Sequence, residues 1–208
     1  MPKLYYTATS CGAASFLAAH VAGVNIEAEQ VNIYTHVTDS GANFYEINPK
    51  GNVPTVVLDD GTVLNENAAT LQFIGDLDST HSILPAAGTS ARYEVIAALS
   101  YVGTEYHKAV GPLFNPTISD DVRAYVLANL NSKLAYLNDK VFNTRTFWVG
   151  EKLSVADLYL YICLSWSGYL KLDLSPYPNV VAFQERVGAI PAVQAGHARI
   201  ATNPAHTL

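Results

Sequence analysis

The sequence is poor in cysteine, methionine and charge. Its 208 residues include two cysteines and one methionine, and only 14% of them are charged. Cys11 and Cys163 lie in unrelated contexts, which is not the pattern of a disulfide-rich secreted domain, so we expect two free thiols in a reducing compartment such as the cytoplasm. The N-terminus also lacks the basic and then apolar pattern of a signal peptide. We therefore expect a cytoplasmic protein.

Basic residues are fewer than acidic ones. Twelve Lys and Arg against eighteen Asp and Glu give a net charge of −6, which offers no attraction for nucleic acid or an anionic membrane. No run reaches the ~18 apolar residues of a membrane span. The nearest candidate, LYLYICLSWSGYL after Asp157, is better explained as a buried helix. We predict no metal site, no nucleic-acid partner and no membrane partner.

Half of the residues are hydrophobic, which is typical of a folded globular chain. The first 79 residues mix strand and helix signals: a strand at 4–7, a helix over 12–21 and a second strand at 29–33. Asp60-Gly61 between two apolar runs is a strong hairpin signal, and a helix follows to about residue 77. The order predicts an α/β domain with one parallel unit, an antiparallel hairpin and a closing helix.

Residues 80–91 are polar and contain proline and glycine, so we expect a linker. Residues 92–208 are helical in pattern throughout and predict an all-α second domain. Within it, Ser119 is expected to cap one helix. Ser154 and Asp157 form a capping-box signature before another, which we interpret as structural.

Cys11 lies where the first strand gives way to the first helix. If that helix begins at Gly12, its N–H groups and dipole favour a thiolate and lower the pKa of the cysteine. The alternative is a half-buried packing residue, because free cysteines are usually buried. Tyr6 and Ser10 are hydroxyls at the same strand end, so position alone leaves the choice of active group open.

Two further motifs could bind a ligand. In NVPT, residues 52–55, a cis Val53–Pro54 bond would turn the backbone of Val53 toward a peptide ligand, although trans bonds are far commoner. In NEN, residues 65–67, a helix N-terminus suits a carboxylate and Glu66 suits an ammonium. The alternative for NEN is ordinary capping by Asn65.

The first helix of the second domain places four residues on one stripe by helical spacing: Ile96, Ser100, Gly103 and His107. Small residues and a histidine on one stripe are compatible with the wall of a cleft. A lone histidine is also commonly structural, so both interpretations stay open.

Taken in order, these motifs resemble the glutathione transferases. KLYY followed by Cys11, NPKGNVPTVVLDDGTVLNE, TEYHKAVGPLFNP and FWVGEKLSVADLYLY are similar to the bacterial beta class over nearly the whole chain. The resemblance implies a thioredoxin-like domain (1–79), a linker (80–91) and an all-α domain (92–208). It also implies a homodimer and glutathione as co-substrate.

The resemblance assigns roles to single residues. Cys11 would face the glutathione sulfur, with Ser10 or Tyr6 as alternative activators, and His107 would approach the thiol. Glutathione would be held by a second set: Asn52, Val53, Pro54, Glu66 and Asn67, together with His36 and Ser100 at positions where the beta class commonly has lysine and asparagine.

Three activities are compatible with this assignment. The first is conjugation of the glutathione thiol to a hydrophobic electrophile, with Tyr106, Phe114, Trp166 and Tyr169 contributing apolar contacts. The second is a glutathione-dependent thiol–disulfide transferase in which Cys11 cycles through a mixed disulfide. The third is a non-catalytic ligand-binding protein that keeps the fold.

Overall fold

The computed structural model describes residues 1–201. The chain divides into two compact units, each described here by itself. The first comprises residues 1–86 and the described residues from 190 onward, and the second comprises residues 87–189.

The first unit is built on a five-stranded sheet in the order β3-β2-β1-β4-β5. The strands are β1 Lys3–Tyr6, β2 Glu27–Asn32, β3 Val37–Thr38, β4 Thr55–Val57 and β5 Val63–Asn65. β1 is parallel to β2 and antiparallel to β4, and β4 and β5 form an antiparallel hairpin. The predicted strand–helix order is confirmed, with the short edge strand β3 added to it.

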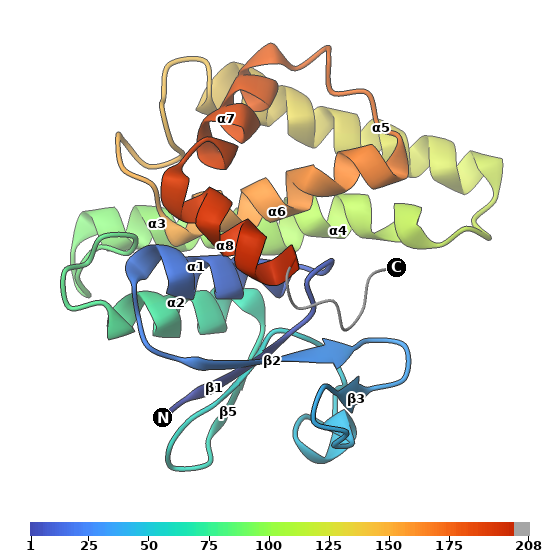
Figure 1. Ribbon diagram of the computed structural model, residues 1–208. Coiled ribbons are helices and arrows are strands. Elements are labelled where there is room, and N and C mark those ends of the chain that lie inside the picture. Colours follow the sequence, from blue (N-terminus) through green and yellow to red (C-terminus); the bar gives the residue numbers. More distant parts are fainter. Residues whose placement is uncertain (202–208) are drawn as a thin grey trace. The chain divides into compact units, whose positions relative to one another are not determined.

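Successive side chains of β1 face opposite sides of this sheet. α1 (Ala13–Ala22) and α2 (Asn67–Leu77) lie on one face, as Figure 1 shows. On the other face Tyr5 packs against Phe44 of the 3₁₀ turn η1 (Phe44–Glu46), in a cluster that includes Val53. Tyr6, the next residue of the strand, is fully buried and stacks on Phe16 of α1. The two adjacent tyrosines therefore pack on opposite faces of the sheet.

The β4–β5 hairpin closes at the predicted turn. The Leu58 N–H donates to the Thr62 carbonyl at 2.8 Å, and the Thr62 N–H donates to the Asp60 carboxylate at 2.9 Å. Gly61 has φ +85°, a conformation that glycine adopts without a Cβ penalty. The Asp-Gly signal is thus confirmed at its position.

The division of the chain differs from the predicted boundaries at both ends of the helical part. Residues 78–84 belong to the first unit: the Asp78 carboxylate binds Thr80 and Ser82, and Leu84 is fully buried. α8 (Pro191–Ala201) also packs in this unit, because Gly196 lets it approach Leu17 of α1 so closely that a Cβ would lie 2.6 Å from that side chain. The remaining residues of the predicted helical domain, 202–208, lie outside the described part.

The second unit is helical, as predicted. Its elements are α3 Ser90–Tyr101, the π segment η2 Val102–Tyr106, α4 His107–Val110, the 3₁₀ turn η3 Gly111–Phe114, α5 Asp120–Tyr136, the π segment η4 Leu137–Val141, α6 Val155–Leu170 and α7 Pro178–Gly188. Ser119 caps α5 through the Val122 N–H. The capping box at the start of α6 is confirmed by two bonds: the Ser154 N–H and hydroxyl both donate to the Asp157 carboxylate, at 2.8 and 2.6 Å.

The π segment η2 interrupts the stripe predicted from Ile96 to His107. The His107 N–H donates to the Val102 carbonyl five residues back, instead of four. A wider turn of this kind rotates everything after it relative to a regular helix. The stripe is therefore not the straight α-helical ridge that the spacing predicted.

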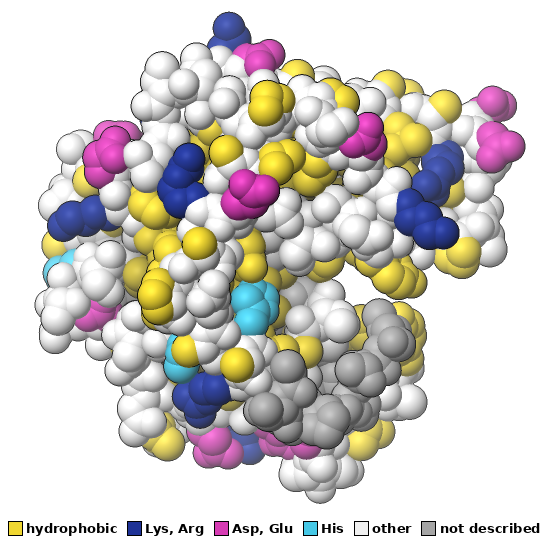
Figure 2. Space-filling model, turned by 45° about the horizontal axis from the view of Figure 1, so that its top comes forward, with side chains coloured by type: hydrophobic (Ala, Val, Ile, Leu, Met, Phe, Trp, Pro, Cys, Tyr) yellow, Lys and Arg dark blue, Asp and Glu magenta, His cyan; other side chains and the backbone are white. Residues whose placement is uncertain are grey.

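On the face in Figure 2, basic and acidic side chains are interspersed. Within residues 1–201, no helix combines the length and apolar character needed to cross a membrane.

Candidate functional site

Cys11 lies in a tight turn between β1 and α1. The hydroxyl of Ser10 makes two hydrogen bonds within this turn. The Ser10 Oγ donates to the Thr7 carbonyl at 3.0 Å and accepts from the Gly12 N–H at 3.1 Å. α1 itself begins at Ala13, one residue later than predicted. The structure therefore gives Ser10 a role in holding the turn that presents Cys11.

Two other segments fix the position of Cys11. Its Sγ lies 3.6 Å from the Val53 carbonyl oxygen, to which the thiol can donate. Its own carbonyl accepts from the Asn67 side-chain amide at 3.0 Å. The turn, the loop before β4 and the start of α2 therefore meet at this cysteine.

The helix N-terminus does not lower the pKa of the Cys11 thiol as one of the two interpretations expected. Burial raises the pKa of the thiol to about 11, and the negative charge of Glu66 adds to the increase. The N–H groups of Cys11 and Gly12 and the Asn67 amide favour the thiolate but do not offset these effects. The N–H groups at the start of the helix do lower the pKa of Cys11, but desolvation raises it by more. The group present at neutral pH is S–H.

The Val53–Pro54 peptide bond is cis, as the family resemblance implies. Among the described residues the Val53 N–H has no hydrogen-bond partner, while its carbonyl faces the Cys11 thiol. The loop is held from behind by Asn48, a buried residue that the sequence analysis missed. Its amide donates to the carbonyl and side-chain oxygens of Asn52, at 2.9 and 3.1 Å, and to Thr55 at 3.0 Å.

Glu66 lies at the mouth of α2 in a rare conformation, with φ +76°. Its carboxylate forms an ion pair with Lys50 at 2.6 Å, and the same ammonium donates to the Asn65 side-chain oxygen at 2.9 Å. Lys50 was also missed, although it stands in the NPKG stretch directly before the loop.

Asn65 does not cap α2: its amide donates to the Pro54 carbonyl at 2.9 Å and to Thr55 at 3.1 Å. Asn67 is almost fully buried, and its side chain is shared between Cys11 and the Ser15 hydroxyl, which donates to it at 3.2 Å. What the start of α2 can offer a ligand is its backbone N–H groups, since the first turn of a helix leaves them without helical partners.

Tyr6 is separated from this arrangement. Its ring stacks on Phe16 at 4.7 Å and is 2% exposed. Burial raises the pKa of its hydroxyl to about 12, the Asp39 charge adds to the increase, and Arg199 opposes it. The structure shows no contact between this hydroxyl and the Cys11 sulfur, so it gives Tyr6 a packing role.

His36 follows β2 in a left-handed conformation, φ +54°, with its ring 4.3 Å from that of Tyr45. The buried Nδ1 has no hydrogen-bond partner among the described residues. A Cβ on Gly51 would lie 3.0 Å from this nitrogen and 2.6 Å from Tyr45. The histidine is therefore packed against the NPKG loop that leads to Val53.

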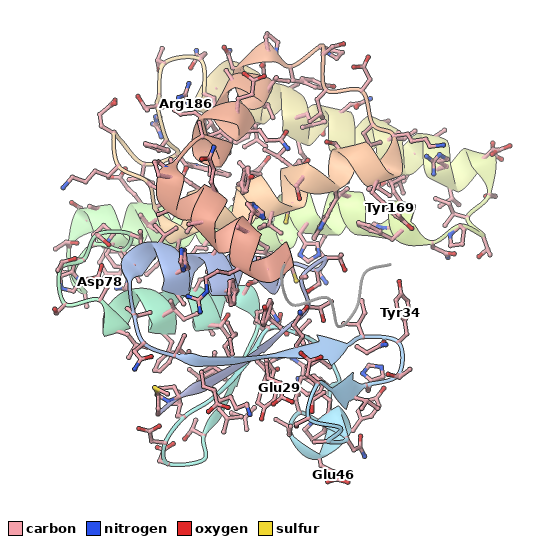
Figure 3. All side chains as sticks on the ribbon, viewed as in Figure 1. Glu29, Tyr34, Glu46, Asp78, Tyr169 and Arg186 are labelled. Carbon is pink, nitrogen blue, oxygen red and sulfur yellow. The ribbon has the colours of Figure 1, made fainter. Side chains whose placement is uncertain are left out.

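The second unit carries the remaining predicted residues. The His107 Nδ1 lies 2.7 Å from the Tyr159 hydroxyl, and Ser100 is exposed on α3. An aromatic cluster joins His107 to Trp166 (5.0 Å), Trp166 to Phe114 (5.3 Å) and Phe114 to Tyr169 (6.0 Å). Figure 3 shows Tyr169 near the end of α6. Tyr106, in contrast, is 1% exposed and cannot contribute to an open site.

Comparison with known proteins decides the family. The model of the glutathione S-transferase N-terminal domain matches residues 11–77, and that of the C-terminal domain matches residues 101–191. The glutathione S-transferase GstA of Escherichia coli O157:H7 is 33% identical over 193 residues, covering 92% of this chain and 95% of that protein. The chain belongs to the glutathione S-transferase family.

Solved glutathione S-transferase structures share the whole fold. The glutathione transferase of Methylococcus capsulatus is 39% identical with a TM-score of 0.92, covering 97% of this chain and 100% of its own. A sphingomonad enzyme complexed with glutathione is 35% identical with a TM-score of 0.90 (96% and 98% covered). The beta-class enzyme of Sphingomonas chungbukensis is 33% identical with a TM-score of 0.88 (95% and 98%). These matches confirm the predicted fold class and the resemblance to the beta class.

Proposed function

We propose that this protein conjugates the thiol of glutathione to hydrophobic electrophiles. Family membership supports the transferase activity and glutathione as co-substrate, in preference to the redox and non-catalytic alternatives. The observation that carries the proposal is the meeting of the Cys11 thiol, the Val53 backbone and the mouth of α2.

This arrangement matches the chemistry of a γ-glutamyl tripeptide. The N–H and carbonyl of Val53 can pair with the cysteinyl backbone as one more strand would. The carboxylate of Glu66 suits the α-ammonium, and the N–H groups at the mouth of α2 suit the α-carboxylate. Glu66 is paired with Lys50, so binding of glutathione would exchange this ion pair for one between Glu66 and the ligand ammonium. We assign His36 to the glycyl carboxylate and Asn52 to the wall beside it.

The protonated state of Cys11 defines its part in the reaction. The cysteinyl N–H of glutathione would donate to the Val53 carbonyl and replace the hydrogen bond from the Cys11 thiol. The Cys11 S–H could then donate to the ligand sulfur instead. Such a donor stabilises the glutathione thiolate, whose proton leaves to solvent before the sulfur attacks the electrophile. Ser10 holds the turn, and Tyr6 is not needed.

The aromatic cluster of the second unit suits the apolar part of the electrophile. Phe114 and Tyr169 are 41% and 69% exposed, so their rings are available to a ligand. We assign His107 to positioning within this cluster through its bond to Tyr159, and Ser100 remains a predicted contact of glutathione.

We also propose a cytoplasmic homodimer with a role in detoxification. The two free cysteines fit a reducing compartment. Sedimentation equilibrium at micromolar concentration tests the dimer, and a mass of 22.4 kDa would contradict it.

The test combines glutathione titration calorimetry with conjugation of 1-chloro-2,4-dinitrobenzene. Glu66→Gln should raise the KM for glutathione about tenfold and leave its value for the electrophile unchanged, because a charged hydrogen bond is lost. Glu46→Gln, an exposed carboxylate on η1, is the matched control and should change neither. Absence of glutathione binding at millimolar concentration would contradict the proposal.

A further inference from the structure

A small buried polar cluster lies between α1 and α2, the two helices that cover one face of the sheet (Figure 1). It consists of Ser15 on α1 and of Asn67 and Thr70 on α2, which are 0%, 5% and 0% exposed. Asn67 and Thr70 are three positions apart, so they lie on the same face of their helix. All other buried residues of the two helices are apolar.

The direction of each hydrogen bond in this cluster follows from the Cys11 carbonyl, which can only accept. The Asn67 amide donates to this oxygen at 3.0 Å, so the Asn67 Oδ1 is turned toward Ser15. The Ser15 hydroxyl donates to Oδ1 at 3.2 Å, and its oxygen can then only accept from the Thr70 hydroxyl, at 3.0 Å. A chain of hydrogen bonds therefore runs from Thr70 through Ser15 and Asn67 to Cys11.

The Cys11 carbonyl has no capacity for a third donor. It also accepts from the Ala14 N–H at 3.1 Å, so both of its lone pairs are used. A helical serine commonly donates to the carbonyl four residues before it, which for Ser15 is that of Cys11. Here the Asn67 amide holds that acceptor, and the Ser15 hydroxyl orients Asn67. Ser15 therefore acts on Cys11 through Asn67.

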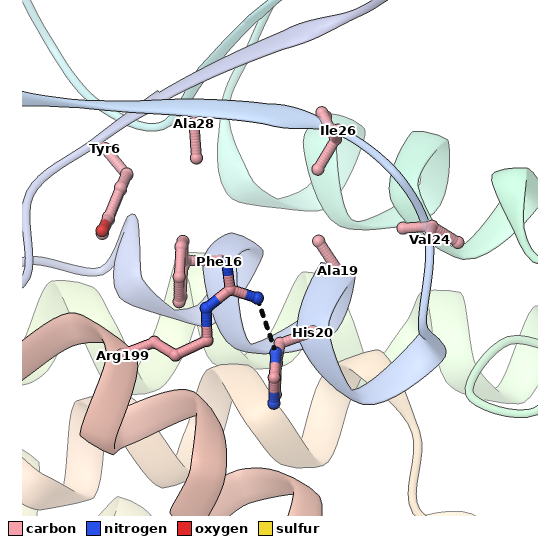
Figure 4. A pocket seen from close by; sticks show the side chains of 8 residues that line it. All are labelled: Tyr6, Phe16, Ala19, His20, Val24, Ile26, Ala28 and Arg199. Carbon is pink, nitrogen blue, oxygen red and sulfur yellow. Dashed lines mark hydrogen bonds between the residues drawn. The ribbon is translucent and has the colours of Figure 1, made fainter.

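The hydroxyls of this cluster do not line the cavity of the first unit. Figure 4 shows Phe16, Ala19 and His20 of α1 facing that cavity, and neither Ser15 nor Thr70 is part of its lining. Alanine in place of Ser15 and valine in place of Thr70 would fill nearly the same space without the cost of burying a hydroxyl. The hydroxyls therefore contribute orientation.

We propose that Ser15 is a positioning residue for the conjugation reaction: it holds the Asn67 amide against the Cys11 backbone and so fixes the direction of the Cys11 S–H. Thr70 holds Ser15 in turn. The inference rests on the proposed function, in which that S–H donates to the glutathione sulfur. A thiol whose backbone is held less firmly stabilises the glutathione thiolate less, while the groups that bind the γ-glutamyl end are unchanged. The expected consequence is a loss of kcat with little change in KM.

Ser15→Ala tests the proposal in the full chain, with glutathione and 1-chloro-2,4-dinitrobenzene as substrates. It should lower kcat at neutral pH about fivefold, the factor for one neutral hydrogen bond, and change the KM for glutathione less than about twofold. The apparent pKa of the kcat profile should rise, because the thiolate of bound glutathione is stabilised less. Ser132→Ala makes the same substitution on α5, where the hydroxyl donates to the Asn129 carbonyl, and should change none of these. A lower melting temperature with an unchanged pH profile would mean a purely structural role and would overturn the proposal.

Thr70→Val keeps the shape of the side chain and removes the hydroxyl. It should lower kcat about twofold, whereas Thr70→Ser should match the wild type. Should Ser15→Ala fail to fold, this pair of variants decides, and equal kcat values in the two would overturn the proposal.

The crystal structure of ligand-free Ser15→Ala gives a measurement that does not depend on glutathione. The Asn67 amide should turn away from the Cys11 carbonyl, and an Asn67 side chain that keeps its wild-type position would overturn the positioning role. Absence of conjugation by the wild-type protein would contradict the proposed function, and the position of Asn67 in the variant would still decide whether Ser15 orients it.

Discussion

The sulfur of Cys11 lies 3.6 Å from the carbonyl oxygen of Val53, forty-two positions along the chain. The contact joins the turn before α1 to the loop before β4. It also indicates which protonation state the site holds, because a carbonyl oxygen accepts a hydrogen bond from S–H and repels a thiolate. Burial acts in the same direction by raising the pKa of the thiol to about 11.

Alkylation of Cys11 should therefore be slow at neutral pH. Only the thiolate reacts with iodoacetamide, so the rate should rise with pH toward a midpoint near 11. Peptide mass spectrometry after timed quenching measures this rate. A midpoint below 8 would show that the helix N-terminus prevails over burial.

Cys163 provides the internal control for this experiment. It is 1% exposed on α6 and should remain unmodified while the protein is folded. The variant Cys163→Ser confirms the assignment by leaving the pH profile unchanged, and Cys11→Ser should abolish labelling of the native protein.

Asp157→Ala should destabilise the second unit by roughly 3 kcal/mol. The carboxylate accepts from the Trp148 N–H and from the N–H and hydroxyl of Ser154, and its loss leaves buried donors without partners, at about 1–3 kcal/mol each. Urea denaturation measures the difference. Ser119→Ala, which removes the exposed cap of α5, should cost only about 1 kcal/mol; equal losses would contradict a special role for Asp157.

Local sequence rules predicted the elements whose causes are local. The Asp60-Gly61 hairpin and the capping box at Ser154 need only a few adjacent residues, and both are found where they were expected. The limits of the first domain could not be found in this way. α8 joins it through the approach of Gly196 to Leu17, a contact between segments that are 179 positions apart in the chain.

At the candidate site, too, local motifs identified residues but could not predict properties that depend on the tertiary fold. Cys11, Val53 and Glu66 were identified from short motifs, but the charge state of the thiol depends on how deeply the fold buries it. The ion pair of Lys50 with Glu66 was missed for a similar reason. This ion pair forms only when the folded chain brings the loop next to the mouth of α2, and the hydrophobic pattern of the sequence does not predict that approach.

Glu29→Gln should reduce stability at pH 7 and have a smaller effect in acid. Burial disfavours its charge, but hydrogen bonds from Lys3 and Ser40 outweigh this and lower the pKa of Glu29 from 4.5 to about 2. Figure 3 shows this side chain on β2. A lowered pKa contributes stability above pH 4.5 that is lost as pH falls toward 2, here up to roughly 3 kcal/mol.

Urea titrations of wild type and Glu29→Gln at pH 7 and at pH 3 test this effect. The difference between the two proteins should shrink in acid, whereas the exposed Glu46→Gln should show little difference at either pH. A difference that grows in acid would mean that the sign is wrong.

Gly51→Ala should damage both stability and glutathione binding. The residue has φ +66°, and an added Cβ would lie 2.6 Å from the Tyr45 ring and 3.0 Å from His36, so the loop must shift. That loop leads directly to Val53, whose backbone we assign to glutathione.

Gly61→Ala separates the two causes, because Gly61 also has a positive φ, +85°, but a Cβ there would meet nothing within 4 Å. Gly61→Ala should lower the free energy of unfolding by only about 1 kcal/mol, the cost of an alanine in the left-handed conformation. It should keep the wild-type KM for glutathione. Gly51→Ala should lose more stability and raise that KM several-fold. If the two variants behave alike, backbone conformation alone is responsible, and the packing of His36 and Tyr45 against the loop has no part in holding the glutathione site.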